Sequence, residues 1–140
     1  MQTLAVPASR HALTEQESPA AAADWLMHAA RHLDPRLPDR TVGMAGQVAR
    51  ALVENAIIHG APPVTIDVSV TAVVTIEVAD HGPGWPAARL DGTGSLAVVV
   101  GELTSLWDVT EHDDGSKTVT AMVPIREEPA VPRARKRVRR

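Results

Sequence analysis

The chain has 140 residues, of which 44% are hydrophobic, and this size and composition suit a single domain with one core. Its formal net charge of −3 conceals an asymmetry, because six of the fourteen basic residues lie in the last eight positions. The first 132 residues carry eight basic and seventeen acidic side chains, a net charge of −9. An acidic body argues against a nucleic-acid-binding surface, so only the basic C-terminal end could contact nucleic acid.

The absence of cysteine excludes disulfides and thiolate metal sites, and it favours a reducing compartment. The first residues show no basic segment followed by an apolar run, as a secretory signal would. The longest apolar stretch, Leu96–Val100, is too short to span a bilayer. We therefore expect a cytoplasmic protein without membrane association.

The first elements that the sequence predicts are a short strand and a helix. Thr3–Val6 is apolar enough for a brief first strand. Ser18 is a suitable N-cap and Pro19 suits the first helical position, so we predict a helix over Ala20–Leu33. Pro35 then prevents its continuation.

A second helix is predicted from Asp39 to Ile58, with Gly60 as its C-terminal glycine. Ala51, Asn55 and His59 are spaced by four and form a row along one flank of this helix. This row borders an apolar stripe that would pack on a sheet. The residues of this stripe are Ala45, Val48, Ala49, Leu52, Val53 and Ala56.

Two half-buried strands follow, because apolar and polar residues alternate over Val64–Val70 and again over Val74–Val78. Continuing the second alternation places Asp80 on the same face as Val74 and Val78. A carboxylate is thus directed to the buried side where the strand ends, and a charge in that position needs a partner.

The C-terminal half begins with a glycine-containing connection over residues 82–94. A third helix is predicted from Ser95 to about Leu106. Trp107–Glu111 and Lys117–Ile125 then indicate a closing hairpin around an Asp-Asp-Gly turn. Residues 126–140 contain proline and dense charge with little to bury, so we predict a basic, disordered tail after a domain of residues 1–125.

Helices on one face of a mostly antiparallel sheet make an α+β fold. Four motifs in order then resemble the GHKL ATPase superfamily, or Bergerat fold: ALVENAIIHG at 51–60, DHGPG at 80–84, GTG at 92–94 and KTVTAMVP at 117–124. The resemblance covers Leu4–Ile125 and is closest to small bacterial anti-sigma-factor serine/threonine kinases. It implies a Bergerat-type two-layer sandwich.

The resemblance also implies ATP and magnesium as cofactors. Asn55 would ligate the magnesium ion that bridges the phosphates, since an amide oxygen is a hard neutral ligand. Asp80 would accept a hydrogen bond from the adenine amino group. The other residues that the resemblance assigns to the nucleotide are Gly82, Gly84, Gly92, Thr93, Gly94 and Thr118.

One position departs from the family pattern. The kinases and ATPases of the family carry a glutamate as general base one helical turn before the asparagine, and here that residue is Ala51. Glu54 lies about 100° around the helix from Asn55, so it is poorly aimed at the same phosphate. A positioned base supplies about 10² to 10⁴ in rate. We therefore expect no catalytic base here, and phosphoryl transfer that is weak or lost while ATP binding survives.

The resulting expectation is a regulatory ATP-binding protein in transcription control, whose partner is a sigma factor or an anti-anti-sigma-like antagonist. Homodimer formation stays open. An alternative is a nucleotide-independent protein-interaction module on a degenerate Bergerat scaffold, because only seven residues separate Gly84 from Gly92 and Ser95 displaces the leucine that usually follows the second glycine motif. Nucleic-acid binding through the basic tail, and a detached histidine-kinase domain, are further alternatives.

Overall fold

The computed structural model describes residues 8–82 and 101–127. The strand expected at Thr3–Val6, most of the glycine-containing connection and most of the basic tail lie outside the described residues. The elements, in chain order, are β1 (Ala8–Ala12), α1 (Pro19–Leu33), α2 (Asp39–His59), β2 (Thr65–Val70), β3 (Val73–Asp80), β4 (Leu106–Glu111) and β5 (Lys117–Pro124).

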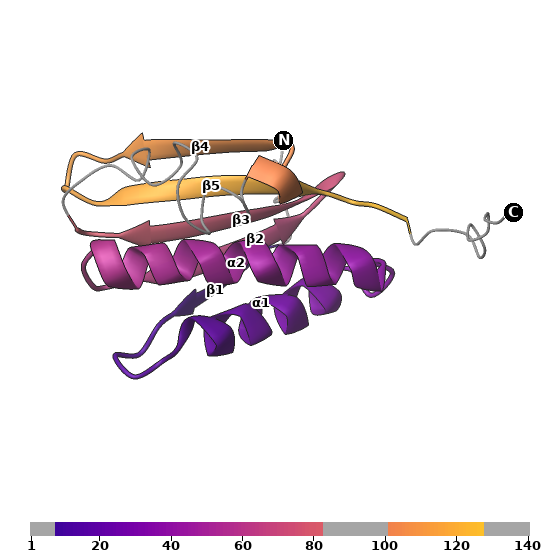
Figure 1. Cartoon of the computed structure of the whole chain (residues 1–140), viewed down its shortest axis with the longest axis horizontal. Helices are drawn as coiled ribbons and strands as arrows, with labels where there is room; N and C mark the ends of the chain where they lie inside the picture. The colour runs from indigo at the N-terminus through magenta and orange to yellow at the C-terminus, as the bar shows by residue number, and fades with distance from the viewer. Residues whose placement is uncertain (1–7, 83–100, 128–140) are drawn as a thin grey trace, which may run out of the picture.

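The strands of the described residues form one antiparallel sheet in the order β1-β2-β3-β5-β4. Both helices lie on the same side of this sheet, with α2 against β3 and β5 and α1 against β2 (Figure 1). The opposite face carries polar side chains of β2, β3 and β5. The predicted α+β class, with helices on one face of an antiparallel sheet, is confirmed.

Helix α1 begins as the sequence predicted. The Ser18 side chain accepts a hydrogen bond from the Ala21 amide at 3.0 Å, which satisfies one of the donors left open at a helix start. Pro19 occupies the first turn, where its missing N–H costs nothing. The helix buries Leu26 completely between α2 and the sheet.

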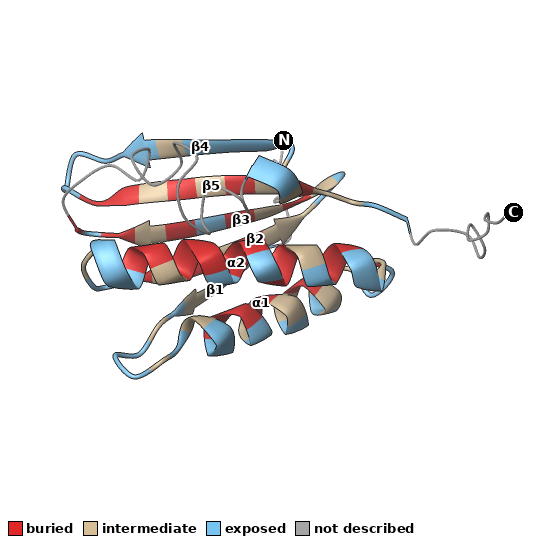
Figure 2. Cartoon of the chain, in the orientation of Figure 1, coloured by how far each residue is buried: buried red, intermediate tan, exposed pale blue. Residues whose placement is uncertain are grey.

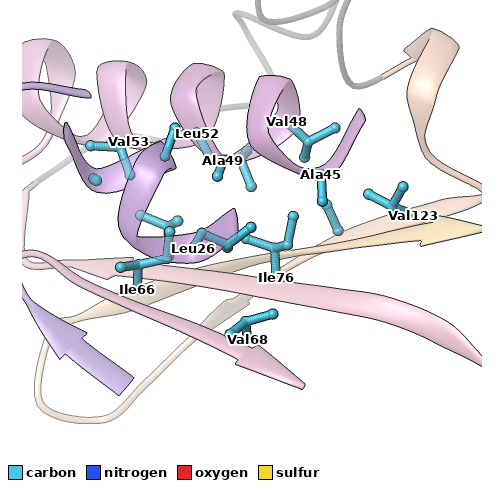
Figure 3. Packing of buried hydrophobic residues seen from close by; sticks show 14 of the residues in the cluster. Leu26, Ala45, Val48, Ala49, Leu52, Val53, Ile66, Val68, Ile76 and Val123 are labelled. Atoms are coloured by element: carbon cyan, nitrogen blue, oxygen red, sulfur yellow. The ribbon is translucent and has the colours of Figure 1, made fainter. Parts of the chain in front are cut away.

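Helix α2 packs on the sheet through the predicted stripe, all six residues of which are buried (Figure 2). Its small and branched residues let the helix approach the sheet closely, and Figure 3 shows Ala45, Val48 and Ala49 above Ile76 and Val123. Each large apolar side chain buried in this layer contributes about 1.5 to 3 kcal/mol. This layer fixes where the last turn of α2 meets the ends of the strands.

Two expectations need correction. The edge strand β1 at Ala8–Ala12 was not predicted, because ASRHA has no apolar alternation; it exists because it pairs with β2. The third helix does not reach Leu106, because this residue opens β4 opposite Met122. The described helical residues there are 101–103, and the Ser105 amide already donates to the Met122 carbonyl at 2.8 Å.

The chain after β5 is joined to the start of α2. The buried Thr41 hydroxyl donates to the Arg126 carbonyl at 3.1 Å and accepts from the Arg126 amide at 2.8 Å. Ordered contacts therefore extend to Arg126. No helix in the described ranges is long and apolar enough to cross a membrane.

Candidate functional site

Asp80 ends β3 on the helix-covered face and is only 2% exposed. Its Oδ1 atom accepts the Gly82 amide at 2.7 Å and the Lys117 ammonium at 2.8 Å. Lys117 is itself 5% exposed, and it also donates to the Gly82 carbonyl at 3.0 Å. The expectation that this buried carboxylate needs a partner is confirmed, and the partner is Lys117.

The pairing register explains how a lysine reaches this position. Lys117 opens β5 directly opposite Asp80, and the two side chains leave their strands on the same face. Lys117 is also in phase with the buried residues Val119, Ala121 and Val123. The sequence analysis missed this residue, although that alternation was the signal that could have found it.

The turn before β5 orients the start of that strand. Gly115 has φ of +90°, which favours glycine, and Ser116 donates to Asp114 Oδ1 from its amide at 2.9 Å and from its hydroxyl at 2.6 Å. These two hydrogen bonds lower the pKa of the Asp114 carboxyl below its ordinary value. The predicted Asp-Asp-Gly hairpin turn is therefore present, and it leads directly into Lys117.

The end of α2 lies against the end of β3. A Cβ added to Gly60 would come within 2.5 Å of the Asp80 carboxyl group, and one added to Gly82 would overlap the Gly60 backbone. The His81 amide donates to the Ala61 carbonyl at 2.9 Å, which ties the two segments together. Gly60 is the C-cap residue of α2, as predicted, and its φ is −103°, so this position needs glycine for the close approach to Asp80 and not for a left-handed backbone.

Asn55 lies on α2 five residues before Gly60, about 7.5 Å along the helix axis. It is 9% exposed, and its carboxamide makes no hydrogen bond within the part of the chain that the structure describes. A buried amide without a partner costs about 1 to 3 kcal/mol. Its oxygen is therefore available to a ligand.

These side chains meet the chemical requirements of a nucleotide and a metal ion. Asn55 offers one neutral oxygen, and magnesium usually takes few protein ligands besides phosphates and waters. No described residue donates to Oδ2 of Asp80, which leaves a buried acceptor for a base amino group. Groups of three or more acidic or histidine side chains that could hold a metal alone are absent from residues 8–82 and 101–127.

The comparisons with known proteins agree with this arrangement. A family described as histidine kinase-, DNA gyrase B-, and HSP90-like ATPase matches residues 43–127, which is more than half of the chain. The chain belongs to this ATPase family. Members of the family bind ATP, usually with magnesium. A comparison with curated proteins found no significant match.

Within this ATPase domain, the matched region starts inside α2 and runs through β5, so it includes Asn55, Asp80 and Lys117. Strand β1 and helix α1 precede it. They complete the sheet edge and the helical layer but contribute none of the three side chains.

Ala51 lies one helical turn before Asn55 and is 8% exposed. A methyl group can neither accept a proton nor orient a hydroxyl. Glu54 precedes Asn55 by one residue and is half-buried, and its side chain leaves the helix about 100° away from that of Asn55. The carboxylates of α2 are Asp39 in its first turn and Glu54.

Thr118 lies on the other side of the sheet from the site. Strand alternation turns its side chain away from the face that Lys117 and Val119 share. Its hydroxyl is 2.9 Å from Nε2 of His112, the residue that follows β4. The β5 side chain that contacts Asp80 is that of Lys117, and Thr118, which the resemblance assigns to the nucleotide, is its neighbour on the opposite face. The remaining nucleotide-binding expectations, Gly84, Gly92, Thr93 and Gly94, lie outside the described residues.

A separate hollow of about 200 Å³ opens beside the last turns of α2. It lies between α2 and the segment that joins β1 to α1, and Asp80, Lys117 and Asn55 do not line it. Its lining residues are Leu13, Thr14, Glu15, Glu17, Ala56, Ile57, Pro62 and Val64.

Proposed function

We propose that this chain is a cytoplasmic regulatory protein that binds ATP with magnesium between the last turns of α2 and the end of β3. The observation that carries the proposal is the buried carboxamide of Asn55, which has no hydrogen-bond partner in residues 8–82 and 101–127 and lies about 7.5 Å along α2 from the glycine that contacts Asp80. Asn55 is the proposed magnesium ligand and Asp80 the proposed acceptor of the adenine amino group. Gly82 lets the backbone after Asp80 lie against Gly60 at the end of α2. Magnesium, when bound, would neutralise charge on the phosphates.

The proposed biological role is that of the anti-sigma-factor kinases that the sequence resembles. The protein would hold a sigma factor or an antagonist protein and use ATP to set which of the two it binds. Because Ala51 stands where a glutamate would act as base, the nucleotide works through binding, with phosphoryl transfer weak or lost. Gly84 remains a proposed nucleotide contact, and Gly92, Thr93 and Gly94 remain proposed phosphate contacts.

The test is isothermal titration of the wild-type chain, Asn55→Ala and Asp80→Asn with ATP, each with and without magnesium. We expect Asn55→Ala to reduce affinity mainly when magnesium is present, because it removes a metal ligand. Asp80→Asn should reduce affinity under both conditions. The matched control is Asp67→Asn, which removes a carboxylate from the polar face of the sheet. Equal affinity of all four proteins for ATP would refute the proposed site.

A second candidate function is a protein-interaction module that no longer uses nucleotide. The observation that favours it is the Lys117 ammonium, which already compensates the Asp80 carboxylate without any ligand. Thermal melting in millimolar ATP and magnesium separates the two functions, since a ligand that binds only the folded chain raises the melting temperature. An unchanged melting temperature, together with a sigma factor captured in the absence of ATP, would favour the module.

A further inference from the structure

Within the described residues, one N–H of the Lys117 ammonium and one oxygen of the Asp80 carboxylate have no hydrogen-bond partner. A lysine ammonium has three donors, and Lys117 uses one on Asp80 Oδ1 and one on the Gly82 carbonyl. The carboxylate uses Oδ1 for both of its hydrogen bonds, and nothing in the described chain donates to Oδ2. Among the described residues, a buried donor and a buried acceptor therefore lie side by side without hydrogen-bond partners.

Because these two groups are buried, their lack of partners among the described residues indicates that a ligand could bind them. The exposed Arg10–Asp67 pair on the polar face satisfies both carboxylate oxygens, at 2.7 and 2.8 Å. Asp80 and Lys117 are 2% and 5% exposed, so water reaches them poorly, and buried polar groups in folded proteins rarely lack partners. An adjacent donor and acceptor match a ligand edge that presents an acceptor next to a donor. Adenine presents two such edges, N7 with the 6-amino group and N1 with the 6-amino group. The N1 edge lies opposite the ribose, so it can enter a buried site while the sugar and phosphates stay outside.

We infer that Lys117 is a base-contacting, specificity-determining residue, whose third N–H donates to adenine N1 while Asp80 Oδ2 accepts from the 6-amino group. This inference rests on the proposed function, because it places the base of ATP at Asp80. It adds that the base is recognised at two adjacent atoms and not by the carboxylate alone. Lys117 also orients the carboxylate, since its hydrogen bond to Oδ1 leaves Oδ2 for another donor.

Ligand analogues test this on the unmodified protein. Titrations with ATP, 1-deaza-ATP and 7-deaza-ATP compare the loss of the N1 acceptor with the loss of the N7 acceptor on otherwise identical bases. A hydrogen bond from a charged donor predicts that 1-deaza-ATP binds about tenfold or more weakly than ATP. The 7-deaza analogue should stay within about threefold of ATP, because no contact to N7 is proposed.

The Lys117→Met variant, combined with the 1-deaza analogue, makes a double-mutant cycle that isolates the interaction between Lys117 and adenine N1. Methionine keeps the apolar stem and removes the donors, so the tenfold penalty of 1-deaza-ATP should fall below about threefold in this variant. The control is Arg10→Met, which removes one positive charge from an exposed pair and should retain the full penalty. Circular dichroism establishes that each variant is folded, and the analogue series on the wild-type chain decides the question if Lys117→Met does not fold.

The outcomes separate the two proposals. ATP binding with equal affinity for ATP and 1-deaza-ATP overturns the role of Lys117 and leaves the proposed function standing. An equal loss with both deaza analogues overturns it as well, because the effect would not be specific to N1. No binding of ATP at millimolar concentration refutes the proposed function, and the role of Lys117 falls with it.

Discussion

Replacing Lys117 by methionine would leave the Asp80 carboxylate in a site that is 2% exposed, with the Gly82 amide as its remaining described donor. Breaking a buried ion pair from one side costs about 3 to 5 kcal/mol, because the other charge stays buried without compensation. Domains of this size have total stabilities of about 5 to 15 kcal/mol. The substitution should therefore remove a large share of the folding free energy.

Urea denaturation followed by circular dichroism measures this effect. With a denaturant slope of about 2 kcal/mol per M, the expected loss lowers the unfolding midpoint by about 1.5 to 2.5 M. The control Arg10→Met breaks the pair with Asp67, whose arginine side chain is 73% exposed, and surface pairs contribute about 0 to 1 kcal/mol. Loss of one positive charge from the polar face of the sheet should thus lower the free energy of unfolding several-fold less than loss of the Lys117 charge.

The double variant Asp80→Asn with Lys117→Met tests whether the loss of stability comes from the uncompensated charge of Asp80. It removes both charges and keeps an acceptor for the Gly82 amide, so it should be more stable than Lys117→Met alone. A loss below about 1 kcal/mol for Lys117→Met would refute the reasoning, because the buried charge would then be compensated in another way. A double variant no more stable than Lys117→Met would also refute it.

Three further predictions follow from the site. Gly82→Ala should lower the free energy of unfolding by about 1 to 3 kcal/mol, because its Cβ would overlap the Gly60 backbone; melting without nucleotide measures this, and an unchanged melting temperature would contradict the packing. Ala51→Glu should raise phosphate transfer from labelled ATP to a partner protein if the base alone is missing, and no increase would show that more than the base has been lost. Ser116→Ala should raise the pKa of Asp114 toward its ordinary value in an NMR titration. An unmoved pKa in the variant would exclude the Ser116 hydroxyl as a cause. Since the folded-state pKa is lowered, this carboxylate stabilises the fold above its unfolded pKa, and the contribution disappears as the pH falls through the folded value.

Local periodicity was sufficient to predict most of the described elements. The apolar stripe of α2, the cap at Ser18 and the alternation in β2 and β3 are properties of neighbouring residues, so they can be identified without knowing the fold. The same alternation correctly directed Asp80 to the buried face. The order of the motifs indicated the ATPase family, to which the matched region of residues 43–127 belongs.

Pairing between distant segments decided the rest. The sequence of β1 has no strand pattern, and this segment is a strand because β2 offers it an edge. Leu106 was expected in a helix and is a strand residue because β5 pairs with it. Such choices depend on the register between segments far apart in the chain, which local propensity does not contain.

For this protein, then, the sequence alone determined helices α1 and α2, the central strands and the inward direction of Asp80, since each depends on residues a few positions apart. Only the tertiary structure decided that Lys117 neutralises Asp80 and that Thr118 faces the other way. The physical reason is that the register of β3 on β5 sets which side chains share a face, and a shift of one residue would exchange them.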